Sequence, residues 1–133
     1  MNSFRKLLVW QKAHDLALRA DTLSKRIAPK KPTLARQLER AADSVPSNIA
    51  EGRGRATDAD FAHFVTMAIG SVTEVENHLQ RGYDGGLIPR AEYESLTDAA
   101  IEVRKMPVGL RKALKGSPRK PAMQPTTQAK VDG

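Results

Sequence analysis

The sequence predicts an all-α protein, an antiparallel up-down-up-down four-helix bundle with a disordered basic C-terminal tail. Three observations support this fold class. Apolar residues recur at steps of three and four along four successive segments, which is the spacing of one buried helix face. No segment alternates apolar and polar residues as a strand does. Proline and glycine gather between the segments, where short turns would join antiparallel neighbours. We therefore assign residues 1–114 to the bundle and residues 115–133 to the tail.

The first expected helix lies between Ser3 and the prolines Pro29 and Pro32. Ser3 can act as its N-cap, because a side-chain oxygen satisfies free N–H groups at a helix start. The apolar face of this helix consists of Leu7, Trp10, Ala13, Ala17, Ala20, Leu23 and Ile27. The two prolines end the helix and enclose Lys30 and Lys31 in a short basic turn.

The second expected helix has Thr33 as its cap and ends in a run of small residues, AADSVPSNIAEGRGR, at 41–55. Pro46 lies inside this run and has no N–H to donate, so we expect a kink there. The polar side chains that could satisfy backbone atoms freed by the kink are Ser44, Ser47 and Asn48. Gly52 is expected to close the helix in a left-handed conformation. The run is either a kinked core helix or a functional surface.

The third expected helix starts at Thr57, which forms a capping-box spacing with Asp60. Its apolar face consists of Phe61, Phe64, Val65, Ala68, Ile69, Val72, Val75 and Leu79. Gly70 and Ser71 are small, like the residues of the second helix. We therefore expect the second and third helices to pack closely.

The fourth expected helix starts near Pro89, which suits a first helical turn. Its apolar face consists of Tyr93, Leu96, Ala99, Ala100, Val103 and Met106. Pro107 and Gly109 interrupt the pattern, so the helix either stops there or kinks and resumes through Leu114. From Lys115 the chain is rich in Pro, Lys, Gln and Thr without periodicity, which is typical of a disordered tail.

Charge is distributed unevenly along the chain. The net charge is +7 over residues 1–55, −5 over residues 56–110 and +5 over residues 111–133. A basic half and a basic tail favour a polyanionic partner. A basic half beside an acidic half also favours self-assembly. The chain has no cysteine, no apolar run long enough to cross a membrane and no signal-peptide pattern at its start, so we expect a cytoplasmic location without membrane contact.

The sequence contains no convincing catalytic or metal-binding group. His14, His63 and His78 are far apart, and none forms the i, i+4 pair of a helical metal site. Neighbouring acids such as Glu74 and Glu76 are two residues apart and diverge on a helix. We expect no catalytic residue, no metal, no cofactor and no enzymatic activity.

Arginines are the strongest candidates for a binding role. Arg53 and Arg55 follow the end of the second helix, and their guanidinium groups could hold phosphate by paired hydrogen bonds. Glu51 could orient one of them. Arg36 and Arg40, four residues apart, share an outward side of the second helix. The basic tail adds Lys115, Arg119 and Lys120 as further candidate nucleic-acid contacts.

Four runs of sequence resemble the bacterial four-helix bundle family named for proteins encoded in intervening sequences of 23S rRNA genes. They are VWQKA (9–13), QLERAADSVPSNIAEGRGR (37–55), DFAHF (60–64) and IGSVTEVE (69–76). The family motif falls on Ser47, Asn48, Glu51, Gly52, Arg53 and Arg55. The resemblance implies an all-α bundle that can form a homopentameric barrel. A related branch, the accessory variability determinants of diversity-generating retroelements, binds nucleic acid and a reverse transcriptase.

Two functions remain open from the sequence. The first is a non-enzymatic, oligomeric protein that binds RNA or DNA without sequence specificity, with structured RNA or a complex containing a reverse transcriptase as the expected partner. Its phosphate contacts would come from the basic surfaces. The alternative is a protein-interaction module that assembles as a homo-oligomer without nucleic acid. In that case the SNIAEG turn would be a structural joint.

Overall fold

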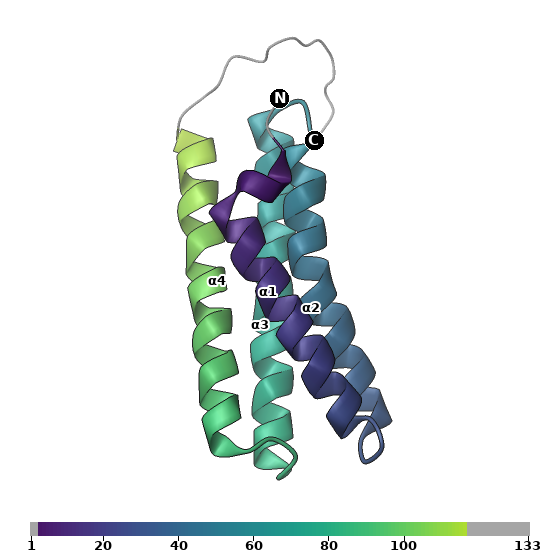
Figure 1. The fold of residues 1–133 in the computed structure, drawn as a ribbon. Coiled ribbons are helices and arrows are strands. Elements are labelled where there is room, and N and C mark those ends of the chain that lie inside the picture. Colours follow the sequence, from purple (N-terminus) through teal and green to yellow (C-terminus); the bar gives the residue numbers. More distant parts are fainter. Residues whose placement is uncertain (1–2, 117–133) are drawn as a thin grey trace.

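The structure, a computed structural model, describes residues 3–116 and the side chains of residues 3–106. A short 3-10 helix, η1 (Phe4–Lys6), precedes α1 (Leu8–Ile27), α2 (Pro32–Arg53), α3 (Asp58–Asp84) and α4 (Arg90–Gly116) (Figure 1). No residue in this part of the chain forms a strand. The predicted all-α class with four helices is confirmed.

Neighbouring helices run in opposite directions. Along α1 and α4, Lys12 pairs with Glu102 and Arg26 pairs with Glu92, so rising numbers on one helix meet falling numbers on the other. Consecutive helices lie side by side, and the chain reverses direction at each connection (Figure 1). All four helices pack around one core.

The core consists of the predicted apolar faces with a few additions. The largest fully buried side chains are Leu16, Leu23, Leu38, Ile49, Leu79, Leu96, Val45, Val65, Val72, Val75 and Val103. Each contributes about 1.5–3 kcal/mol by leaving water. Val9 and Leu16 are buried although the predicted face of the first helix omits them, while Leu7 and Trp10 only flank the core.

Two of the three predicted helix caps are placed differently. The Ser3 hydroxyl accepts a hydrogen bond from the Arg5 N–H at 3.1 Å, so Ser3 caps η1, and α1 begins later, at Leu8. Thr33 lies inside α2, which already begins at Pro32 because proline has the φ angle of a first helical turn. The Thr57 cap is confirmed, since its hydroxyl accepts from the Asp60 N–H at 3.1 Å.

The predicted roles of two glycines are wrong. Gly52 is buried inside α2 without a left-handed backbone, and α2 ends at Arg53. A Cβ on Gly52 would lie 2.7 Å from Cβ of Phe64 and 2.9 Å from Cδ1 of Phe61, so this glycine allows α3 to approach. Gly70 is exposed, with no atom within 4 Å of an added Cβ. The close approach between α2 and α3 lies at Gly52, whereas Gly82 of α3 allows the close approach of Ile88 from the α3–α4 connection.

The two prolines inside helices, Pro46 in α2 and Pro107 in α4, do not end them. α2 continues through Pro46, and α4 continues through Pro107 to Gly116, which excludes a stop at Pro107. Lys115, the first residue of the predicted tail, is therefore still within α4, and residues 117–133 lie outside the described part of the chain. Every helix within residues 3–116 is too short or too polar to cross a lipid bilayer.

Candidate nucleic-acid interface

The corner between α2 and α3 holds most of the SNIAEGRGR motif. The Arg55 guanidinium forms an ion pair with Glu51 at 2.9 Å, as predicted, and lies over the Phe64 ring at 4.6 Å from its centre. Gly52 packs against the same phenylalanine. Arg55 is thus held from two sides by its own chain, and it stabilises the corner.

The polar residues around Pro46 also make local contacts. The Asn48 amide donates to the Ser44 carbonyl at 2.8 Å, and the Ser44 hydroxyl donates to the Ala41 carbonyl at 2.8 Å. These bonds flank the carbonyl of Ala42, which would otherwise accept from an N–H that proline lacks. Asn48 and Ser44 therefore act on the helix backbone, whereas Ser47 is exposed.

The predicted arginines do not form one site. Arg36 and Arg40 are exposed near the start of α2, and Arg53 is half-buried at its end. At about 1.5 Å per residue, Arg40 and Arg53 are separated by about 20 Å along the helix axis. The side chain of Lys115 is not described, and the predicted contacts Arg119 and Lys120 lie outside the described residues.

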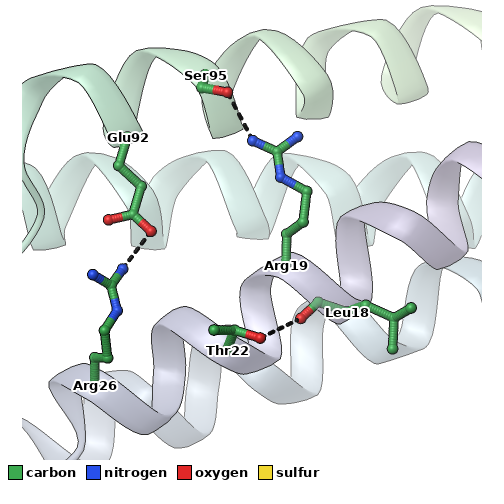
Figure 2. A network of polar contacts seen from close by, with 6 residues as sticks. All are labelled: Leu18, Arg19, Thr22, Arg26, Glu92 and Ser95. Carbon is green, nitrogen blue, oxygen red and sulfur yellow. Dashed lines mark hydrogen bonds and ion pairs between the residues drawn. The ribbon is translucent and has the colours of Figure 1, made fainter.

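The sequence did not predict three polar contacts between α1 and α4, two of which, Arg26 with Glu92 and Arg19 with Ser95, are shown in Figure 2. Arg26 forms an ion pair with Glu92, the Arg19 guanidinium donates to the Ser95 hydroxyl at 2.7 Å, and Lys12 lies 3.2 Å from Glu102. The three cations are seven residues apart and so share one side of α1. That spacing is the signal that could have found them. They bring basic and acidic parts of one chain together.

Four exposed cations lie close together in the sequence at the turn between α1 and α2. We define the turn patch as Lys30, Lys31, Arg36 and Arg40, all exposed. None of the four has an ion pair with another residue in the described part of the chain. Their charges are therefore available to an external anion.

Acidic residues near the turn patch face one another across α1 and α2. A hydrogen bond to Asp21 raises the pKa of Glu39, and loss of hydration raises the pKa of Asp43. Lys25 lies 3.6 Å from Asp21 and offsets part of this negative charge. Glu39 and Asp43 thus lie near Asp21 of α1, and neither forms an ion pair with Arg36 or Arg40.

The histidines have separate surroundings. His14 stacks on Trp10 with ring centres 4.7 Å apart, and His63 meets the Phe64 ring edge-on. His78 is buried, its Nδ1 has no hydrogen-bond partner, and loss of hydration lowers its pKa. Among residues 3–106, no group of three His, Cys, Asp or Glu side chains is arranged to hold a metal ion.

Comparisons with known proteins agree with this architecture. The family model described as 23S rRNA-intervening sequence protein matches residues 5–109. A crystal structure of a protein with unknown function from the S23 ribosomal protein family of Bacteroides thetaiotaomicron is similar, with 25% sequence identity and a TM-score of 0.76. The match covers 79% of this chain and 99% of that chain. No curated protein matches the chain.

Proposed function

Because the chain belongs to the family of 23S rRNA-intervening sequence proteins, we propose that it is a non-enzymatic protein that binds nucleic acid through basic surfaces and assembles as a homo-oligomer. The observation that carries the proposal is the turn patch, a group of exposed cations without carboxylate partners. Such cations bind phosphates through charge, which gives affinity without base readout.

The expected partner is structured RNA or an RNA–protein complex such as one containing a reverse transcriptase. The family resemblance motivates this partner and a pentameric assembly. Absence of cysteine suits a reducing cytoplasm as the site of action. The chain has only three phenylalanines, two tyrosines and one tryptophan, so base stacking contributes little and the contacts are to the backbone.

An assembly module without nucleic acid is the second candidate. The Glu51–Arg55 pair and the packing of Gly52 against Phe64 favour this second candidate, because they give the family motif a structural role between α2 and α3. Self-assembly through the basic and acidic halves of different copies is less strongly supported than the sequence suggested, because Lys12 and Arg26 already pair with acids of the same chain. We therefore place nucleic-acid binding first.

A filter-binding titration of the full chain tests the proposal. Duplex RNA, single-stranded RNA and duplex DNA are titrated at several salt concentrations between about 50 and 200 mM. The expected result is binding that weakens steeply with salt. Absence of salt-sensitive binding at every concentration, together with a defined oligomer by sedimentation, would favour the assembly module.

A further inference from the structure

The turn between α1 and α2 presents its lysines on a fixed backbone. The N–H groups of Lys30 and Lys31 donate to the Ile27 carbonyl at 3.0 and 2.8 Å. The Lys31 carbonyl accepts from the Ala35 N–H at 3.0 Å. Pro29 and Pro32 flank the two lysines and restrict their backbone further. A surface that is already ordered loses little conformational freedom when it binds.

Arg36 and Arg40 extend this positive surface along α2. Leu34 and Leu38 are buried on the core side of the same turns, so the arginines, two residues further along, point away from the core. The arginines lie one helical turn apart, about 6 Å along the axis. Glu39 and Asp43 each follow one of these arginines by three residues, but neither forms an ion pair with it in the described part of the chain.

Several other cations of the bundle are engaged within the chain. Lys12, Arg26 and Arg104 form ion pairs across helices, and Arg55 lies between Glu51 and an aromatic ring. The turn patch differs because it combines four exposed cations in a short stretch with no such pair. A phosphate backbone can therefore contact these four cations without displacing an ion pair of the described chain.

We infer that the turn patch is the principal nucleic-acid contact and that it binds the phosphate backbone of a double helix. This inference depends on the proposed function and gives it a location and a partner type. The stretch from residue 11 to residue 60 contains no Phe, Tyr or Trp, so no ring in α2 or its flanking turns could stack on an unpaired base. A duplex needs no stacking partner, since its bases are already paired and its phosphates face outward.

Charge-matched variants of the full chain test the inference. The turn variant carries Lys30→Gln, Lys31→Gln, Arg36→Gln and Arg40→Gln. The control variant carries glutamine at four exposed cations elsewhere, namely Lys6, Arg81, Arg90 and Lys105. Both are titrated with the same duplex RNA, single-stranded RNA and anionic phosphatidylserine vesicles, after circular dichroism has shown unchanged helix content. A double variant with only the two lysines replaced serves if the turn variant does not fold.

The expected result is a loss of duplex affinity of at least about tenfold in the turn variant and less than about threefold in the control. If these cations contact phosphates, the salt dependence of duplex affinity is also weaker in the turn variant than in the control. Equal losses of duplex affinity in both variants would overturn the assignment of the principal contact to the turn patch and leave the proposed function intact. Stronger binding to single strands or to vesicles would overturn the duplex assignment. Absence of all nucleic-acid binding in the unmodified chain would overturn the proposed function itself.

Discussion

Two glycine-to-alanine substitutions test the packing of α2 against α3 with the same added atom. Gly52→Ala places a Cβ 2.7 Å from Cβ of Phe64, an atom fixed to the α3 backbone, whereas Gly70→Ala places a Cβ in open space. Both gain about 1 kcal/mol in helix propensity. Only Gly52→Ala also suffers overpacking, which typically costs about 1–3 kcal/mol. The difference between the variants therefore isolates the contact and should be about 1–3 kcal/mol.

The measurement is urea unfolding followed by circular dichroism at a fixed protein concentration. Gly70→Ala should have a free energy of unfolding about 1 kcal/mol higher than that of the unmodified chain, because it gains helix propensity without a new contact. Gly52→Ala should be the least stable of the three proteins. Gly82→Ala should fall between the two variants, because the nearest atom to its Cβ is the movable Cδ1 of Ile88 at 2.6 Å. A Gly52→Ala protein as stable as Gly70→Ala would refute this account of the corner.

Three further predictions concern charged groups. A double-mutant cycle of Glu51→Gln and Arg55→Gln should give a coupling energy of about 0.2–1 kcal/mol by urea unfolding, because the pair is partly exposed and joins the last turn of α2 to the residue just beyond it. Arg26→Gln should cost no more than about 1 kcal/mol, and the loss measured in the same way should shrink in 1 M salt, since its ion pair with α4 is partly exposed. Burial lowers the pKa of His78 in the folded protein, so in the ordinary histidine range near pH 6.5 the unfolded chain binds more protons than the folded chain. The free energy of unfolding should therefore fall as the pH drops from about 7.5 through this range. His78→Gln should reduce this dependence in unfolding curves at several pH values, and an unchanged pH profile would count against it.

Local signals in the sequence predicted the four helices and most of the core. Steps of three and four identify a buried face because they depend only on helix geometry. The Thr57 cap was predictable for the same reason, since its partner Asp60 is three residues away. Ser3 and Thr33 have equally good side chains, but neither caps the predicted helix. A residue type permits a cap without specifying where the backbone turns.

Contacts between distant segments were less predictable. Arg26 and Glu92 are 66 residues apart, and their pairing depends on the register of α1 against α4, which periodicity does not determine. Gly52 was assigned to a helix end because glycine commonly ends helices, whereas its role here comes from Phe61 and Phe64 on the next helix. Arg36 and Arg40 were identified by charge alone, whereas Arg53 and Arg55 were also identified by their place at the end of the second helix and by the family motif. The structure separates Arg55, which pairs with Glu51, from Arg36 and Arg40, which form no ion pair in the described part of the chain.

The contact between Gly52 and Phe64 fixes which sides of α2 and α3 meet at this corner. A residue inserted within α2 just before Glu51 would rotate the helix by about 100° and bring the larger side chain of Glu51 to the place that Gly52 occupies. The α2–α3 corner therefore depends on the register of α2 as well as on the absence of a side chain at one position.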